Sequence, residues 1–186
     1  MRLLACALIF MSTLAGTAAA QLDAASSEAR SAYRQGLLFE RRNDIPAANT
    51  QFEIACEGGD MRGCLAAANN YRVGNTIPQD FTKAAGWYAL ACEGDAGEGC
   101  SALGYLANKG LGLDQDYAVS LDYYQRGCDL GELSGCAGAG NLLLTGTGVP
   151  HDRVEGARLL RQACLGDYEW SCTRLRDLGQ PLELGQ

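Results

Sequence analysis

The sequence predicts an all-α protein built as a solenoid of αα-hairpin repeats. A nine-residue segment bounded by two cysteines occurs four times at intervals of 36 residues: Cys56 to Cys64, Cys92 to Cys100, Cys128 to Cys136 and Cys164 to Cys172. A fixed period of this length is the signature of a repeat array. Helical periodicity dominates around these segments, and no stretch alternates apolar and polar residues for long enough to indicate a strand.

The first twenty residues have the features of a secretory signal peptide. Arg2 precedes an apolar run at 3–14, and small residues follow at 17–20, where signal peptidase cleaves. We expect residues 21–186 to form a single repeat domain that is exported to the periplasm or secreted. No later segment approaches the roughly 20 apolar residues of a transmembrane helix, so we expect no membrane insertion of the mature chain.

The cysteine count and the net charge limit which classes of partner and cofactor we expect. The chain has nine cysteines, and Cys6 lies in the leader, so an even number remains for disulfides in an exported protein. The formal net charge is −7 and there are only two lysines. Nucleic acids are therefore not expected as partners, because phosphate binding needs clustered Lys and Arg. We expect no cofactor, no metal and a monomeric chain.

An amphipathic helix is predicted ahead of each first cysteine, at 45–55, 81–91, 117–127 and 154–163. A large apolar residue recurs in one register on these helices, which predicts a packing face: Phe52, Tyr88, Tyr124 and Leu160. An aspartate precedes each helix and is predicted to cap its first turn: Asp44, Asp80, Asp116 and Asp152. Of the adjacent aromatic pairs Trp87-Tyr88 and Tyr123-Tyr124, one member should pack between repeats and the other should meet the convex surface.

A second helix is predicted after each second cysteine, at 64–73, 100–109, 136–145 and 172–178. Three of these helices end at a glycine suited to a positive φ, namely Gly74, Gly110 and Gly146. The resulting organisation is a first hairpin at 28–58, repeats at about 60–94, 96–130 and 132–166, and a C-terminal capping helix at 168–178. His151 follows Pro150 in a turn, and we interpret it as a solvated loop residue.

The cysteines are predicted to form one disulfide per repeat. Cys56 and Cys64 each lie four residues from Asp60, so antiparallel helices joined at Asp60 bring them within the Cα separation that a disulfide needs. The predicted pairs are Cys56–Cys64, Cys92–Cys100, Cys128–Cys136 and Cys164–Cys172. Zinc binding and redox catalysis are the alternatives. Zinc sites commonly use closer cysteine pairs, and a redox site needs an exposed, acidic thiol.

The repeat unit resembles the Sel-1-like repeat, which is related to the tetratricopeptide repeat. The resemblance rests on Ala-Cys-x7-Cys at period 36, Leu103-Gly104, the Gly110 and Gly146 turns, and Asp116-Tyr117. The doubled cysteines resemble the exported, cysteine-rich Hcp proteins. The resemblance implies a right-handed superhelix that acts as a scaffold for proteins or peptides. It also implies an alternative function, because penicillin binding or weak β-lactamase activity has been assigned to some cysteine-rich members.

The tetratricopeptide register places a set of polar and aromatic residues on the concave surface, where we predict peptide binding: Arg30, Tyr33, Arg41, Asn69, Arg72, Tyr105, Asn108, Lys109 and Asn141. Asn can donate to and accept from a peptide backbone, and Arg or Lys can pair with a carboxylate. The expected ligand is an acidic or C-terminal peptide segment. Whether the chain is an enzyme is left open and no catalytic residue is assigned, since no Ser-x-x-Lys occurs.

Overall fold

The computed structural model describes residues 27–179 as helices joined by short turns, with no strand in that range. The predicted signal peptide at 1–20 and the tail at 180–186 lie outside the described residues. The chain divides into two compact units, residues 1–63 and 64–186, which are described separately below. The predicted fold class, a solenoid of αα-hairpins, is confirmed.

Unit 1 contains a helical hairpin. Residues 27–41 are helical, and α2 follows at Ile45–Glu57. Asp44 caps α2 by accepting a hydrogen bond from the backbone N–H of Ala47 at 3.2 Å. The Phe52 side chain is fully buried, and the Tyr33 ring packs against it with the ring centroids 5.7 Å apart.

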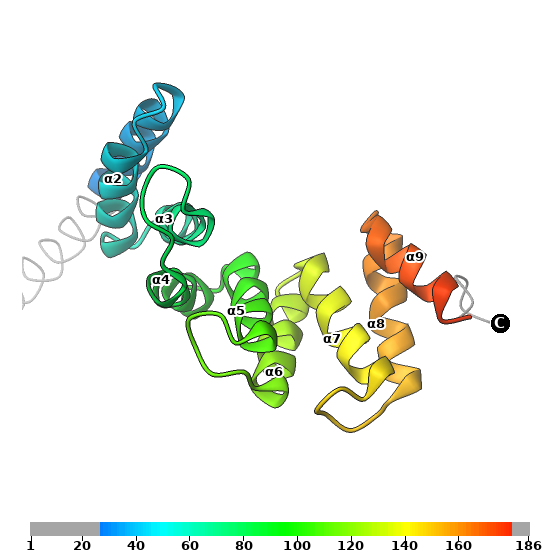
Figure 1. The fold of residues 1–186 in the computed structure, drawn as a ribbon. Helices are drawn as coiled ribbons and strands as arrows, with labels where there is room; N and C mark the ends of the chain where they lie inside the picture. Colours follow the sequence, from blue (N-terminus) through cyan, green and yellow to red (C-terminus); the bar gives the residue numbers. More distant parts are fainter. Residues whose placement is uncertain (1–26, 180–186) are drawn as a thin grey trace, which may run out of the picture. The chain divides into compact units, whose positions relative to one another are not determined.

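Unit 2 begins within α3 (Met61–Val73) and continues through six further helices. These helices are α4 (Phe81–Glu93), α5 (Gly97–Lys109), α6 (Tyr117–Asp129), α7 (Leu133–Thr145), α8 (Arg153–Leu165) and α9 (Glu169–Asp177). From α4 onward each helix packs against the next, and α5 also packs against α7 (Figure 1). Each repeat therefore makes its contacts mainly with its neighbours, as in other solenoids.

The helices are longer than their predicted bounds. The helices of the second set, α3, α5, α7 and α9, begin three residues before the second cysteine, and those of the first set run two residues beyond the predicted ends. Helical hydrogen bonding thus continues up to a turn of three residues, such as 94–96 between α4 and α5. As a result, both cysteines of each pair lie inside helices.

Disulfides join the helices on either side of these turns. The structure links Cys92 to Cys100, Cys128 to Cys136 and Cys164 to Cys172, with Cα atoms 4.6, 4.5 and 4.8 Å apart. Cys56 and Cys64 are also disulfide-bonded. The helices can approach so closely because small residues meet there: a Cβ on Gly99 would lie 2.7 Å from the Ala91 Cβ. The prediction of one disulfide per repeat is confirmed.

The predicted capping residues act as expected in unit 2. Asp80, Asp116 and Asp152 each accept hydrogen bonds from backbone N–H groups in the first turn of the following helix. Gly110 and Gly146 end α5 and α7 with φ values of 66° and 62°. L-residues other than Gly rarely adopt this conformation without strain, which explains glycine at both positions.

Each long loop of unit 2 has a side-chain hydrogen bond at the equivalent position. Gln79 and Gln115 donate from Nε2 to the carbonyl oxygens of Arg72 and Asn108, at 2.9 and 2.8 Å. His151 lies one period further on, and its Nε2 is 2.8 Å from the Leu144 carbonyl oxygen. Since a carbonyl only accepts, Nε2 carries the hydrogen. His151 is therefore a loop-anchoring residue as well as an exposed one, which corrects the expectation of a purely solvated side chain.

The registered large residues form the core between helices. Tyr88, Tyr124 and Leu160 are buried, as their spacing predicts. Their aromatic neighbours Trp87 and Tyr123 are half-buried and pack against the cluster around Tyr88. The second member of each aromatic pair is thus the buried one, and the first is partly exposed and packs at the edge of the core.

Candidate functional site

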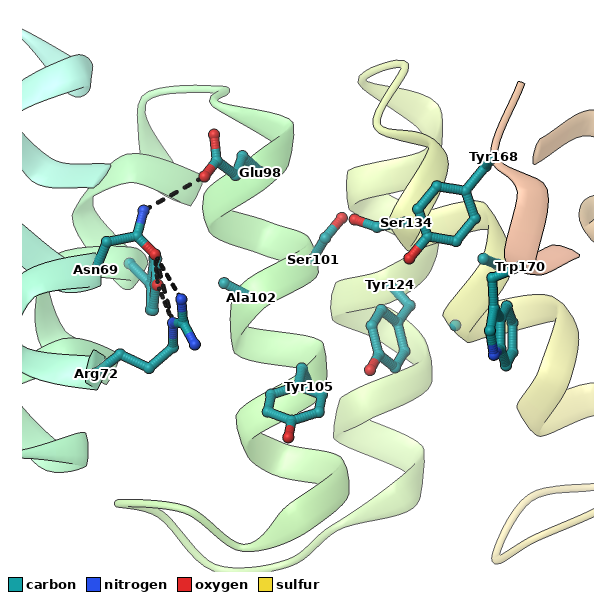
Figure 2. Close-up of a pocket in the computed structure, with 13 residues that line it drawn as sticks. Asn69, Arg72, Glu98, Ser101, Ala102, Tyr105, Tyr124, Ser134, Tyr168 and Trp170 are labelled. Carbon is teal, nitrogen blue, oxygen red and sulfur yellow. Dashed lines mark hydrogen bonds between the residues drawn. The ribbon is translucent and has the colours of Figure 1, made fainter. Parts of the chain in front are cut away.

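A groove of about 610 Å³ lies in unit 2 and is lined by residues of six of its helices, α3 to α7 and α9. One face of α5 forms its centre, with Glu98, Ala102 and Tyr105 spaced by four and three residues and Ser101 beside Ala102 (Figure 2). Such spacing places side chains in one row along a helix. Residues of α3 line one end of the groove, and residues of α7 and the start of α9 line the other.

The end near α3, here called the polar end, is a hydrogen-bonded cluster. The Tyr88 hydroxyl donates to Asn69 Oδ1 at 2.7 Å, and Arg72 Nη2 donates to the same oxygen at 3.2 Å. Arg72 Nε also donates to the Tyr88 hydroxyl at 3.1 Å, and Asn69 Nδ2 donates to Glu98 at 3.5 Å. These contacts fix the orientation of the Arg72 guanidinium at the groove (Figure 2).

The polar end contains one cation, Arg72, and one carboxylate, Glu98. Within residues 27–179, no carboxylate forms an ion pair with Arg72. Burial raises the pKa of Tyr88, and the hydrogen bond from Arg72 opposes that rise. Tyr88 is therefore a neutral phenol at physiological pH. Arg72 thus remains a half-buried cation that can accept a carboxylate as its partner.

The floor of the groove consists of small side chains. Ser101, Ala102, Ala137 and Gly138 line it, and a Cβ on Gly138 would lie 2.5 to 2.6 Å from ring carbons of Tyr124. Ser101 is 4% exposed, and its Oγ has no hydrogen-bond partner among the described residues. The floor therefore allows close approach by a main chain, while the Ser101 Oγ itself is buried against Gly127 and Gly135.

The end near α9, here called the aromatic end, exposes rings from α5 and from the start of α9. Tyr105 is 45% exposed, Tyr168 36% and Trp170 49%. The Tyr168 and Trp170 rings meet edge to face, with centroids 6.5 Å apart. Tyr124 lies beneath them with its ring buried, and that burial, together with the phenols of Tyr105 and Tyr168, raises the pKa of Tyr124.

Three of the predicted binding residues line the groove, namely Asn69, Arg72 and Tyr105. Asn108, Lys109 and Asn141 do not. The groove runs obliquely, from the last turns of α3 across the middle of α5 to the first turns of α7. Positions in the last turns of α5 and α7 therefore lie beyond its edge, and Asn141 Oδ1 is occupied by a 2.8 Å hydrogen bond from Arg174.

The other predicted binding residues, Arg30, Tyr33 and Arg41, lie in unit 1. Arg30 and Arg41 are exposed, and Tyr33 is half-buried. The Arg62 guanidinium stacks 4.6 Å from the Tyr33 ring centroid, which involves that ring in packing within the unit. Arg30 lines a smaller depression of about 220 Å³ beside Asp60.

Several groove residues were missed by the sequence prediction: Tyr88, Tyr124, Ser101, Tyr168 and Trp170. Tyr88 and Tyr124 were assigned to the core by their register with Phe52 and Leu160. Their hydroxyls could have indicated a place at the edge of the core, because only these two of the four registered residues carry a polar group that needs a partner or solvent. The capping helix was predicted from its charged end, and its aromatic start was overlooked.

The described residues contain neither a metal-binding cluster nor a membrane-spanning helix. Within residues 27–179 there is no group of three or more His, Cys, Asp or Glu that could hold a metal ion. No helix in this range is both long and apolar enough to span a bilayer. The single histidine anchors a loop, and nothing in the site supports the alternative of β-lactam binding or hydrolysis.

Comparisons with solved structures support the repeat architecture. A Sel1 repeat protein from Oxalobacter formigenes matches with a TM-score of 0.74 at 21% identity, over 84% of this chain and 68% of that one. A protective antigen of uropathogenic Escherichia coli strains, described as displaying an SLR fold, matches with a TM-score of 0.74 at 27% identity. That match covers 83% of this chain and 34% of the antigen, so this chain spans about a third of its length.

A cysteine-rich relative is also similar in fold. Helicobacter pylori cysteine rich protein B matches with a TM-score of 0.50 at 24% identity, over 62% of this chain and 92% of that one. No curated protein sequence matches the chain. The family model for the Sel1 repeat matches three times, at residues 63–95, 97–132 and 133–168, which is more than half of the sequence. With its 36-residue hairpins and its solenoid neighbours, the chain belongs to the Sel1 repeat family.

Proposed function

We propose that this protein is an exported scaffold that binds an acidic or C-terminal peptide segment of a partner protein in the groove of unit 2. Sel1 repeats are protein-interaction modules, and this chain is a disulfide-bonded example of them. Disulfides of this kind form and persist outside the cytosol, which supports export to the periplasm or beyond the cell.

The main support for this proposal is the environment of Arg72, which is partly buried, hydrogen-bonded and without an ion-pair partner among the described residues. Its guanidinium is half-buried in the groove and is oriented by Asn69 and Tyr88, and no described carboxylate neutralises it. A cation held in this way binds a carboxylate with little further loss of side-chain entropy. An Arg–carboxylate pair is frequently bidentate, so it favours an Asp, a Glu or a free C-terminus over a neutral group.

The test is selection of peptides by the oxidised chain. A pool of random octapeptides, made with free and with amidated C-termini, is passed over immobilised protein, and the retained peptides are sequenced. We expect enrichment of Asp, Glu or free C-termini, and we expect Arg72→Gln to lose that enrichment because the guanidinium contact is gone. Arg176→Gln is the matched control, since Arg176 is exposed, bonds Thr173 and does not line the groove.

Two results would overturn the proposal. Equal retention of acidic and neutral peptides by the unaltered chain would show that the groove has no preference for anions. Unchanged enrichment in the Arg72→Gln variant would show that any such preference arises elsewhere on the molecule.

A further inference from the structure

We infer that the aromatic end of the groove binds an aromatic side chain of the same peptide, so that the preferred ligand combines an acidic group with an aromatic residue. This inference rests on the proposed function and names its ligand more closely. It concerns Tyr105, Tyr124, Tyr168 and Trp170, none of which contributes to the polar cluster around Arg72.

At the aromatic end, three exposed aromatic rings lie in the same groove. Tyr105 comes from α5, while Tyr168 and Trp170 come from the start of α9, and all three line the same groove. Other exposed apolar side chains of unit 2, such as Val154 and Leu165, do not line it. Single exposed apolar residues are ordinary, whereas a contiguous patch in a groove marks an interaction site.

The rings are also absent from the equivalent positions of other repeats. Tyr168 stands one period after Glu132, and Trp170 one period after Ser134. Tyr105 stands where the neighbouring repeats have Asn69 and Asn141. The repeat fold itself therefore does not require aromatic side chains at these places. The terminal helix of a solenoid usually presents a polar outer face, which makes two exposed rings at its start more informative.

The chemistry of the patch favours a ring over a cation. Rings can bind a positive charge through their faces, and a carboxylate beside them would strengthen such a contact. Among the groove residues the one carboxylate is Glu98, which belongs to the polar end and accepts from Asn69. An aromatic side chain gains from edge-to-face contact with Tyr168 and Trp170 without introducing charge.

The floor between the two ends suits the main chain of such a ligand. Ala102, Ala137 and Gly138 leave room for a backbone to lie close to α5 and α7. The Ser101 hydroxyl is not part of this surface, because its Oγ is fully buried against Gly127 and Gly135.

The inference is tested by Trp170 fluorescence. The chain has two tryptophans, and Trp87 does not line the groove, so Trp87→Phe in the oxidised full chain leaves Trp170 as the single reporter. The probes are capped octapeptides of Gly and Ser with two aspartates at one end, made in both directions. The other end carries phenylalanine, alanine or lysine, which gives the Phe, Ala and Lys peptides.

We expect the Phe peptide to shift the Trp170 emission and to bind at least about tenfold more tightly than the Ala peptide, as burial of one ring implies. Calorimetry on the unaltered chain should give the same ratio. In Trp170→Ala the ratio should fall to about threefold or less, because part of the ring contact is lost. Trp87→Phe, as the control, should keep the full ratio.

The failures are distinguishable. If the Phe and Ala peptides bind equally while Arg72→Gln weakens both, the inference is wrong and the proposed function stands. If the Lys peptide binds most tightly, the patch selects cations and the inference is also wrong. If none of the aspartate peptides binds, both proposals are overturned.

Discussion

The two ends of the groove differ in how their side chains interact: those of the polar end bond to one another, and those of the aromatic end remain exposed to solvent. At the polar end, Asn69, Arg72 and Tyr88 satisfy one another by hydrogen bonds of 2.7 to 3.2 Å. At the aromatic end, Tyr105, Tyr168 and Trp170 leave large rings exposed. The polar end is thus held in place by its own hydrogen bonds, whereas the rings of the aromatic end retain exposed area that a ligand would bury. The following variants separate these two behaviours.

The largest effect is expected from removing a disulfide near each end. Replacing both Cys164 and Cys172 with alanine should lower the free energy of unfolding by about 2.5 kcal/mol, as the chain-entropy model gives for a nine-residue loop. Because this bond holds α9 to α8, Trp170 should become solvated before the rest of unit 2 unfolds. Urea unfolding followed by Trp170 fluorescence and by far-UV circular dichroism measures the separation of the two transitions.

The matched control is alanine at both Cys92 and Cys100, which lie next to the polar end. This change should lower stability by a similar amount while leaving the Trp170 transition coincident with the global one. If both double variants give the same order of unfolding, the two ends are not held independently.

A methyl group on the groove floor should distort the aromatic end. In Gly138→Ala the new Cβ would lie 2.5 to 2.6 Å from the Tyr124 ring, so we expect a loss of about 1–3 kcal/mol in stability from overpacking. Gly86→Ala is the control, because no atom lies within 4 Å of a Cβ there and alanine favours the helix by up to about 1 kcal/mol. Thermal unfolding of both variants checks this, and a Gly138→Ala protein as stable as Gly86→Ala would contradict the packing described.

Removal of one hydroxyl should matter at the polar end and not at the aromatic end. Tyr88→Phe deletes the donor to Asn69, and we expect a loss of about 1 kcal/mol. Tyr124→Phe removes a hydroxyl for which the described chain offers no hydrogen-bond partner, so stability should change by only a few tenths of a kcal/mol. Denaturant unfolding of the two variants measures the difference. A larger loss for Tyr124→Phe would show that the aromatic end is hydrogen-bonded as well.

The smallest effect is expected in alkaline solution. Burial raises the pKa of both Tyr88 and Tyr124, but the hydrogen bond from Arg72 opposes the rise at Tyr88. In the unfolded chain both phenols ionise near pH 10, so stability falls as the pH rises above that value. Tyr124→Phe should remove more of this loss than Tyr88→Phe. Unfolding free energies between pH 9 and 11 check the order, and the reverse order would contradict it.

The repeat fold could be predicted in detail because its determinants are local and recur. The cysteine spacing, the capping aspartates and glycines such as Gly110 each act within one turn of their own position. The helix ends were less predictable, since helices continue until the three-residue turn and both cysteines are helical. The role of His151 became clear only beside Gln79 and Gln115, which make the same loop contact.

The groove could be predicted only in part, because its path depends on how successive hairpins are packed. Of the residues that the tetratricopeptide register indicated, Asn69, Arg72 and Tyr105 line the groove, and their role in peptide binding stays a prediction. It also indicated Asn141, whose side chain is instead bonded to Arg174, a residue 33 positions further along the chain. Because Tyr88 and Tyr124 share a register with the large core residues, their hydroxyls were not predicted to reach the groove. The sequence around Trp170 does not show that this residue lines the same groove as α5.

If the two ends recognise different chemical groups of one ligand, as we propose, a double-mutant cycle with the octapeptides should separate their contributions. Affinities are measured by calorimetry for the unaltered chain, Arg72→Gln and Trp170→Ala, with the Phe peptide and with versions in which Asp becomes Asn or Phe becomes Ala. We predict that Arg72→Gln abolishes only the effect of Asp→Asn, and that Trp170→Ala reduces only the effect of Phe→Ala. Equal effects of both protein variants on both peptide changes would contradict the account.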